Sequence, residues 1–376
     1  MIPVYKPKLR TEEILESLRT TLDSGWVGLG PKVGEFERKL ESFLNTPHAV
    51  ALNSCTSALH LAVKTLPASK TGRKIITTPI TFVSTNHAIL YENYEPVFAD
   101  VEKYTGNLDP RSVEDTIEHF GADNIKAIML VHLGGYPVDL DAFNAISKKY
   151  GIPLIEDCAH AFGSKYKGKA IGDSENVCCW SFQAVKNMPV GDGGAITTKD
   201  PDLNKKLRQM RWLGIDVDTV TRAHGGYKWE YMVTDVGYKY HMNDIIATIG
   251  SVQLRHIDED NARRKEIADF YRANIVSKTG KVCMPNYQDD LESSYWFFPI
   301  FFEEREKIYN HLVEKDIYPS MHFRSNLRYP MFSAAAQMAG CKNSKWYEEN
   351  VLSLPIHLYL TNDDLKKIVD SVMEVL

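Results

Sequence analysis

A lysine and an aspartate in this sequence have the types and settings that covalent chemistry requires. Asp157 ends an apolar run in GIPLIEDCAHAFGS, and Lys186 precedes a glycine-rich turn in CCWSFQAVKNMPVGDGGAITT. A lysine amine can hold an aldehyde as a Schiff base, and a carboxylate facing a ring nitrogen keeps that ring protonated. Together the two residues predict a pyridoxal phosphate enzyme.

Two short segments offer groups that bind a phosphate. NSCTSA follows the apolar run HAVALN and opens an apolar helix, so the backbone amides of Cys55 and Thr56 are available to an anion. The alternative is that Ser54 or Thr56 simply caps the helix. Ser181 adds a hydroxyl, and the GDGG segment at 191–194 allows a tight turn.

Two rings follow predicted strands and are candidates for contacts with a flat cofactor. Phe82 follows KIITTPIT and can cover a ring by offset stacking, or it can be an ordinary core aromatic. His160, three residues after Asp157, can donate a hydrogen bond to the cofactor's phenolic oxygen, or it can be a satisfied histidine at a helix start.

Short β-branched runs alternate with helical patterns through the first 160 residues. The strands are predicted at HAVALN, KIITT, PVFADV, IKAIMLVHL and IPLIEDC, with a helical segment between each pair. This rhythm predicts a mostly parallel sheet with helices on both faces. Ligands of such sheets bind at the carboxyl ends of the strands, where Asn53, Thr81, Phe82, His132 and Asp157 lie.

The later part of the chain has a different organisation. We expect a strand at GAITTKD, a helix from Asp202 to about Arg211, and a functional loop from Gly214 to Tyr231. Residues 243–274 predict one long helix or a kinked pair that connects two domains. We therefore expect a large α/β domain at 1–250 and a small α+β domain at 251–376, with strands at KVCMP and SSYWFFPIFF and a closing helix from Asn362.

Composition narrows the class of protein. The net charge of −5 gives no basic field for nucleic acid or acidic lipid. Six cysteines scattered over 376 residues indicate reduced thiols and a cytoplasmic protein, and the absence of a long apolar run argues against a membrane protein. The adjacent pair Cys178 and Cys179 has no second pair at metal-ligand spacing, so we predict no metal. GLGPKVG at 28–34 lacks the dinucleotide-binding glycine spacing.

Many ordered segments resemble one known family, the DegT/DnrJ/EryC1/StrS aminotransferases, which transfer amino groups to keto sugars. The resemblance covers SGWVGLGPKVGEFERKL, NSCTSALHLA, TTPITFVSTNHAI, VHLGGYPVDLD, EDCAHAFGSKYKGKAIGD, SFQAVKNMPVGDGGAI and GYKYHMNDIIATIGSVQL, and so runs almost from end to end. It implies the fold-type I aminotransferase architecture, a homodimer, and an active site built from both chains.

The resemblance also implies a role for each candidate residue. Lys186 is then the Schiff-base lysine and Asp157 the partner of the ring nitrogen. The implied cofactor contacts are Cys55, Thr56, Phe82, His160 and Ser181. The segment from Gly237 to Asn243 is expected to reach the partner's cofactor phosphate through Lys239 or His241, where the family often has Asn or Arg.

The implied reaction has two halves, with pyridoxamine phosphate as the intermediate form of the cofactor. An amino donor, glutamate by analogy, gives its amino group to the cofactor while freed Lys186 moves the proton, and the keto group of a nucleotide-linked deoxy sugar then receives the amine. A sugar dehydratase on the same fold is the first alternative, although dehydratases replace the lysine by histidine. A non-catalytic regulatory member is the second.

Overall fold

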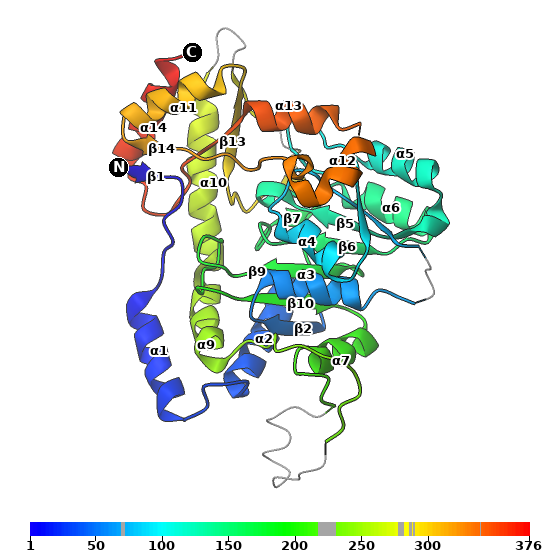
Figure 1. Cartoon of the computed structure of the whole chain (residues 1–376). Helices are drawn as coiled ribbons and strands as arrows, with labels where there is room; N and C mark the ends of the chain where they lie inside the picture. Colours follow the sequence, from blue (N-terminus) through cyan, green and yellow to red (C-terminus); the bar gives the residue numbers. More distant parts are fainter. Residues whose placement is uncertain (69–71, 217–230, 277–281, 286–287, 289, 339) are drawn as a thin grey trace.

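A seven-stranded mixed sheet forms the centre of the molecule (Figure 1). The computed structural model describes residues 1–68, 72–216, 231–276, 282–285, 288, 290–338 and 340–376. The strands are, in sheet order, β2 (His48–Leu52), β10 (Gly194–Thr198), β9 (Val177–Ser181), β6 (Leu154–Asp157), β5 (Ile125–Val131), β3 (Lys74–Thr77) and β4 (Glu95–Phe98). Strand β10 is antiparallel to both β2 and β9, and the other four neighbouring pairs of this sheet are parallel, which confirms the predicted mostly parallel sheet.

Helices cover both faces of this sheet, as the alternating pattern predicts. One face packs against α2 (Pro31–Leu44), α5 (Pro110–Phe120), α6 (Leu140–Tyr150) and α9 (Asp244–Gln253). The other face packs against α3 (Cys55–Lys64), α4 (Ser84–Tyr91) and α7 (Pro201–Met210). Strand β2 shows the reason, because Ala49 and Ala51 enter the first core and Val50 and Leu52 enter the second.

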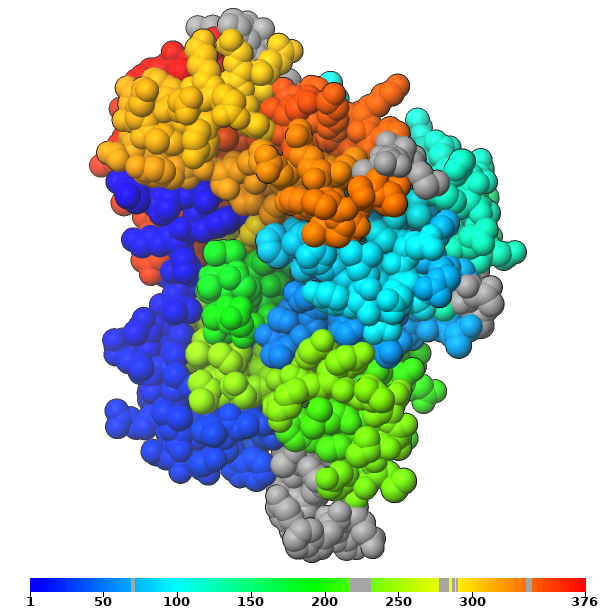
Figure 2. Space-filling model, viewed as in Figure 1, coloured from blue at the N-terminus to red at the C-terminus, as the bar shows by residue number. Residues whose placement is uncertain are grey.

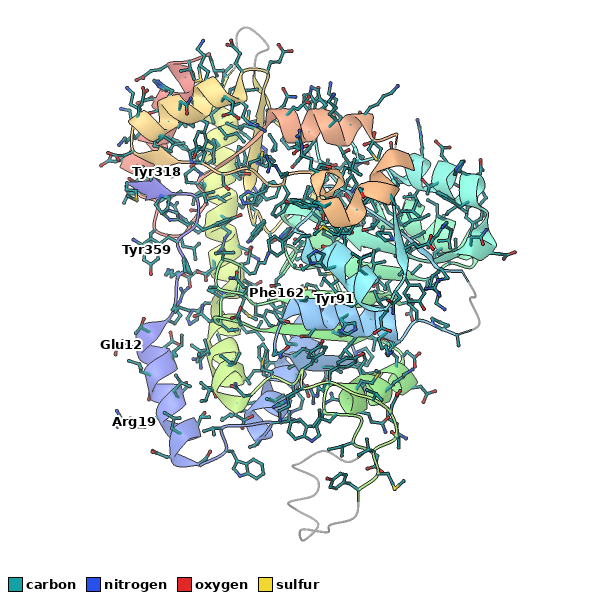
Figure 3. The ribbon with its side chains drawn as sticks, in the orientation of Figure 1. Glu12, Arg19, Tyr91, Phe162, Tyr318 and Tyr359 are labelled. Carbon is teal, nitrogen blue, oxygen red and sulfur yellow. The ribbon has the colours of Figure 1, made fainter. Side chains whose placement is uncertain are left out.

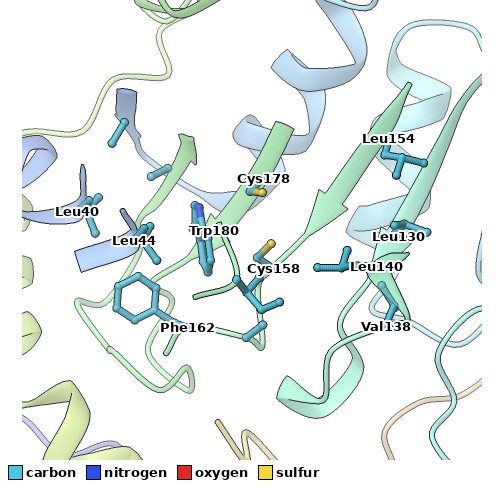
Figure 4. Packing of buried hydrophobic residues seen from close by; sticks show 14 of the residues in the cluster. Leu40, Leu44, Leu130, Val138, Leu140, Leu154, Cys158, Phe162, Cys178 and Trp180 are labelled. Atoms are coloured by element: carbon cyan, nitrogen blue, oxygen red, sulfur yellow. The ribbon is translucent and has the colours of Figure 1, made fainter. Parts of the chain in front are cut away.

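The first core is filled by large side chains that meet between the sheet and its helices. Figure 4 shows Leu40 and Leu44 of α2 near Trp180 of β9, with Phe162 beside them. The rings of Phe162 and Trp180 meet edge to face, with centroids 5.5 Å apart. This packing fixes β9, and β9 leads directly into the turn that carries Lys186.

A second, smaller hydrophobic core lies in the C-terminal part of the chain. Here β13 (Phe298–Phe302) pairs antiparallel with β11 (Val282–Cys283) and β15 (Val351–Leu354). The helices of this part are α10 (Ile257–Asn274), α11 (Arg305–Glu314), α12 (Ser333–Met338), α13 (Lys342–Asn350) and α14 (Asn362–Met373). The predicted small α+β unit is therefore present, and the division at residues 250 and 251, which falls inside α9, stays a prediction.

The N-terminal segment joins this smaller unit. Strand β1 (Ile2–Pro3) runs parallel to β14 (Ile317–Tyr318), and both chain ends lie near each other in Figure 1. The chain then descends to α1 (Thr11–Asp23), which packs on α9. A third small sheet contains β12 (Leu291–Glu292), β7 (Lys165–Tyr166) and β8 (Lys169–Ala170).

The remaining sequence predictions can be compared with these elements. Residues 243–274 form a pair of helices, α9 and α10, joined by a 3₁₀ turn at Leu254–His256, so the kinked alternative is confirmed. Most of the predicted functional loop, residues 217–230, lies outside the described residues. Within the described ranges, none of the helices combines the length and apolar character that crossing a bilayer requires.

A buried ionic cluster behind β2 fixes α2 and α7 to the sheet. The Glu37 carboxylate accepts hydrogen bonds from the Ala51 amide at 2.9 Å, from Arg208 at 2.8 Å and from Arg211. Arg208 and Arg211 also donate to the carbonyls of Ala49 and Ala51. Burial alone would raise the pKa of Glu37, but the two arginines lower it overall. The two arginines are therefore engaged in holding the fold.

We expect Glu37→Gln to destabilise the apoprotein by about 3 kcal/mol, because buried Arg211 and partly exposed Arg208 would both lose the charge that compensates theirs. The charged Glu37 carboxylate stabilises the fold at pH values above the usual glutamate pKa, and this contribution is lost as the pH falls through its lowered pKa. The free energies of unfolding of the wild type and the variant should therefore converge at low pH. Urea unfolding measures the difference. The matched control is Glu35→Gln on the same helix, whose carboxylate meets Lys32 and Lys39 at the surface and should change stability by less than about 1 kcal/mol. Equal losses in the two variants would contradict the role of burial.

Candidate active site

A cavity of about 480 Å³ lies where the carboxyl ends of the parallel strands meet the smaller unit. Its size is within the range of small-molecule sites. The lining residues are Tyr5, Ser54, Cys55, Thr56, Thr81, Phe82, Ser84, Asp157, Ala159, His160, Ser181, Gln183, Val185, Lys186, Asp192, Gly193, Trp296, His322 and Phe323. Seven of the nine candidate residues from the sequence are among them, and Lys239 and His241 are not.

Asp157 is held at the end of β6 by two short hydrogen bonds and by a longer contact of 4.0 Å from the Cys55 thiol to its Oδ1. Its Oδ2 accepts from the Thr85 hydroxyl at 2.8 Å, and its Oδ1 accepts from the Ala159 amide at 3.0 Å. Burial raises the pKa of the Asp157 carboxyl, while these two hydrogen bonds and nearby Lys186 act to lower it. The carboxylate is therefore fixed in orientation and faces a cationic group across the cavity.

Lys186 lies in the turn between β9 and β10 with its amine inside the protein. Its Nζ is 4.1 Å from the ring centroid of Trp296, a cation–π contact. The Trp296 indole is itself fixed, because its Nε1 donates to the Val185 carbonyl at 2.9 Å. Burial lowers the pKa of Lys186 to about 8, although Asp157 and Cys55 act to raise it. About a tenth of this amine is thus uncharged at pH 7, far more than for an ordinary lysine, and this fraction can act as a nucleophile or a base.

The lowered pKa predicts an amine with unusual reactivity in the apoprotein. Acylation of Lys186 by acetic anhydride, followed by peptide mass spectrometry, should rise with a midpoint near pH 8 in place of 10.5. Asp157→Asn should move this midpoint to lower pH, because the Asp157 anion favours the ammonium form. Exposed Lys167, labelled in the same sample, should titrate well above pH 10. A common midpoint for both lysines would contradict the prediction.

The start of α3 faces the same cavity. Ser54 caps the helix by accepting from the Ser57 amide at 3.1 Å, which confirms the capping alternative for Ser54. Strand β10 approaches very closely, since a Cβ on Gly194 would lie 2.4 Å from the Ser54 carbonyl carbon. The last glycine of GDGG therefore permits this contact. The amides of Cys55 and Thr56 begin the helix beside Ser181, an arrangement that fits a phosphate.

The two candidate rings differ in their surroundings. The Phe82 side chain is 58% exposed, so it is not a core aromatic, and it lies on the cavity wall with its ring 6.3 Å from that of Phe323. His160 is buried and stacks flat on Trp296, with ring centroids 3.8 Å apart. Its Nδ1 accepts from the Gly134 amide at 3.4 Å. Burial holds the pKa of His160 well below its usual value, so this imidazole is neutral.

Lys239 and His241 lie on another surface. Both contact Trp212, with the Lys239 Nζ 3.7 Å from the indole ring and the His241 ring at a centroid distance of 4.5 Å. The Lys239 side chain is exposed. In a single chain these two residues therefore do not reach the cavity that holds Lys186.

Sequence reasoning missed several residues of the cavity. Thr85 orients Asp157 from the first turn of α4. The sequence feature that could have indicated it is a hydroxyl side chain shortly after the strand KIIT. Tyr5, Trp296, His322 and Phe323 come from the N-terminal segment and the smaller unit. Their positions depend on tertiary packing across long sequence separations, and no local pattern marks them.

The described residues also contain one group of possible metal ligands, His132, Glu156 and Cys158. The atoms of His132 and Glu156 that could bind a metal already take part in hydrogen bonds within the protein. His132 Nε2 meets Glu156 at 3.0 Å, and its Nδ1 accepts from the Val138 amide at 3.2 Å. The other oxygen of Glu156 accepts from Ser174 and Asn176. This cluster is a saturated hydrogen-bond network.

The chain is similar to known proteins over its whole length. The model of the DegT/DnrJ/EryC1/StrS aminotransferase family matches residues 8–373. The spore coat polysaccharide biosynthesis protein SpsC of Bacillus subtilis is 33% identical over 100% of this chain and 97% of its own length.

Solved structures show the same architecture. The sugar aminotransferase CalS13 from Micromonospora echinospora superposes with a TM-score of 0.91 at 30% identity and covers 100% of both chains. The putative sugar aminotransferase Spr1654 from Streptococcus pneumoniae, solved in a PMP form, has a TM-score of 0.91 at 27% identity over 100% of this chain and 99% of its own. Its PLP form has a TM-score of 0.88.

These similarities confirm the predicted fold-type I architecture and the family resemblance. They also agree with the cavity, which joins a buried amine of lowered pKa, a fixed carboxylate and a helix start suited to phosphate. The chain belongs to the DegT/DnrJ/EryC1/StrS aminotransferase family and is a pyridoxal phosphate-dependent sugar aminotransferase.

Proposed function

We propose that this protein transfers an amino group from L-glutamate to the keto group of a nucleotide-linked deoxy sugar, with Lys186 as the covalent attachment point of the cofactor. The observation that carries the proposal is the buried Lys186 amine, whose pKa falls to about 8 in the same cavity as Asp157. When bound, pyridoxal phosphate supplies an electron-withdrawing ring that stabilises negative charge at the carbon that loses a proton.

The residues of the chain then have distinct tasks. With its amine free, Lys186 would take the proton from the α-carbon of the amino donor and return it to the carbon on the other side of the transferred nitrogen, two atoms away. Asp157 would hold a proton on the ring nitrogen, since hydrogen bonds from Thr85 and the Ala159 amide keep the carboxylate in place. The amides of Cys55 and Thr56 and the Ser181 hydroxyl bind the phosphate.

The two rings hold the cofactor in position. Phe82 would cover one face of the cofactor ring, because it lies exposed on the cavity wall and is free to stack. His160 contacts the ring as a neutral imidazole, which the stack on Trp296 holds in a fixed plane. Neither side chain adds charge to the site, so both serve to bind and orient.

We further infer a homodimer in which Lys239 or His241 reaches the partner's cofactor phosphate. Both residues lie outside the cavity of their own chain, which supports a role in the other one. Exposed apolar side chains accompany them, including Val236 and Met232 on the same segment. The half-exposed Tyr91, labelled in Figure 3, meets the ring of His60, which in turn contacts Tyr238. An apolar surface of this kind favours association between protein chains.

The cytoplasm is the proposed location. Cys55, Cys158, Cys178, Cys179 and Cys341 are free thiols, and reduced cysteines are typical of that compartment.

Two separate half-reactions test the proposed function. The purified protein should be yellow, glutamate should bleach the absorption band, and a keto sugar should restore it. A panel of 3-keto and 4-keto sugars linked to uridine or thymidine diphosphate identifies the acceptor. A band that glutamate leaves unchanged would overturn the donor assignment, and restoration by free sugars as fast as by nucleotide sugars would overturn the nucleotide.

A further inference from the structure

Tyr5 brings the N-terminal segment into the active-site cavity. The segment is anchored on both sides, by pairing of β1 with β14 and by hydrogen bonds from Arg10 to Gln253 and Asp260. Between these anchors it runs along one side of the molecule, where Figure 2 shows the N-terminal residues beneath the C-terminal ones. The Tyr5 ring stacks on Trp296 with centroids 5.1 Å apart and 27° between the planes.

The Tyr5 hydroxyl belongs to a short chain of polar groups. It lies 3.3 Å from His322 Nε2, and His322 Nδ1 lies 2.9 Å from the Ser353 hydroxyl. His322 and Ser353 are buried, and both therefore need these partners. Burial lowers the pKa of His322 to about 3 and raises that of Tyr5. All three groups are therefore uncharged at neutral pH, and the phenol is held in one orientation.

The wall around Tyr5 combines aromatic faces with neutral polar groups. Trp296 and Phe323 supply apolar ring surface next to the Tyr5 hydroxyl. Among the described lining residues, Lys186 is the one side chain that carries a positive charge. Arg264 is close enough to Tyr5 to lower the pKa of the phenol, but it also interacts with Asp260 and does not line the cavity. A carboxylate placed against Tyr5 would therefore lose its hydration without a direct ion partner on the cavity wall, which is costly. A sugar ring has C–H faces for the aromatic rings and hydroxyls for the phenol, so it fits this wall.

We propose that Tyr5 is a specificity-determining residue that binds a hydroxyl of the acceptor sugar and takes no part in binding the amino donor. The inference rests on the proposed function, because it assigns one wall of the same cavity to one of its two substrates. The N-terminal segment thereby joins the substrate-binding surface. Trp296 then supports both the catalytic lysine and the sugar-binding residue, since it contacts Lys186 as well as Tyr5.

The two half-reactions separate this role from a structural one. In Tyr5→Phe, the KM of the pyridoxamine form for a thymidine diphosphate-linked 4-keto-6-deoxyhexose, or for the 3-keto isomer if the panel selects it, should rise about tenfold, the effect of one lost hydrogen bond. The rate and KM of the glutamate half-reaction should stay within about twofold. Binding of the same sugar to borohydride-reduced enzyme, followed by tryptophan fluorescence, should weaken by the same factor as the KM rises.

A matched control is Tyr359→Phe. Tyr359 is largely exposed, contacts Lys6 of the same segment and lies at the edge of the molecule in Figure 3. It should change neither half-reaction. Ser353→Ala should raise only the sugar KM, by less than Tyr5→Phe, because it removes a support of the phenol. Equal losses in both half-reactions of Tyr5→Phe, or an unchanged sugar KM, would overturn this inference alone. Failure of glutamate to bleach the wild-type band would overturn the proposed function first.

Discussion

Lys186→Ala should abolish the covalent attachment of the cofactor and slow amino transfer by at least about 10²–10⁴-fold, the usual contribution of a positioned acid–base group. The lysine has two tasks in the proposed reaction, attachment and proton transfer, and alanine removes both. Borohydride reduction followed by peptide mapping measures the first task. The rate of bleaching by glutamate measures the second.

A small amine can distinguish the two tasks. Because Lys186 lies in a cavity of about 480 Å³, methylamine should enter the space left by alanine and restore part of the proton transfer without restoring attachment to the chain. Lys167→Ala removes an exposed lysine that pairs with Asp141 and should behave as wild type. If Lys186→Ala still gave the same borohydride-stable adduct on the protein, the assignment of Lys186 would be wrong.

The parts of the fold that were predictable share a local signal. Strand β5 is a run of seven residues that are all buried, and such a run is typical of a strand covered on both faces. Residues at both ends of helix α6 indicate where it begins and ends: Asp139 caps its start, and Gly151 follows its end in a left-handed conformation at φ 61°. The short strands β1 and β14 have no such pattern, because two residues pair only when distant parts of the chain are already folded.

The residues of the active site also differ in whether a local sequence signal marks them. Asp157 and Lys186 were predictable because each follows a recognisable strand or precedes a glycine turn. Trp296 was not, although it contacts Lys186, because it lies 111 residues from its hydrogen-bond partner Val185. Lys239 and His241 pack on Trp212 away from their own cavity, and their contact with a partner's cofactor phosphate stays a prediction. Residues that act through tertiary or chain–chain contacts leave no periodic signal.

Asp157→Asn should retain the cofactor and slow the glutamate half-reaction by about 10²–10³-fold, the scale of losing one fixed electrostatic partner. Asparagine keeps the size of the side chain and an oxygen that can accept from Thr85 or the Ala159 amide. It cannot carry the negative charge that holds a proton on the ring nitrogen. Stopped-flow measurement of the bleaching by glutamate reports the loss, and absorption after gel filtration reports retention of the cofactor.

Thr85→Val separates the charge of Asp157 from its orientation. The variant keeps the carboxylate but removes the 2.8 Å hydrogen bond, so we expect a loss of about tenfold, as for one hydrogen bond to a charged group. Because Thr85 lowers the pKa of Asp157, its removal should raise that pKa and move the acidic limb of the rate profile to higher pH. Unchanged rates in Asp157→Asn would contradict the role of the charge. A loss in Thr85→Val without any shift of the acidic limb would assign the hydroxyl to structure alone.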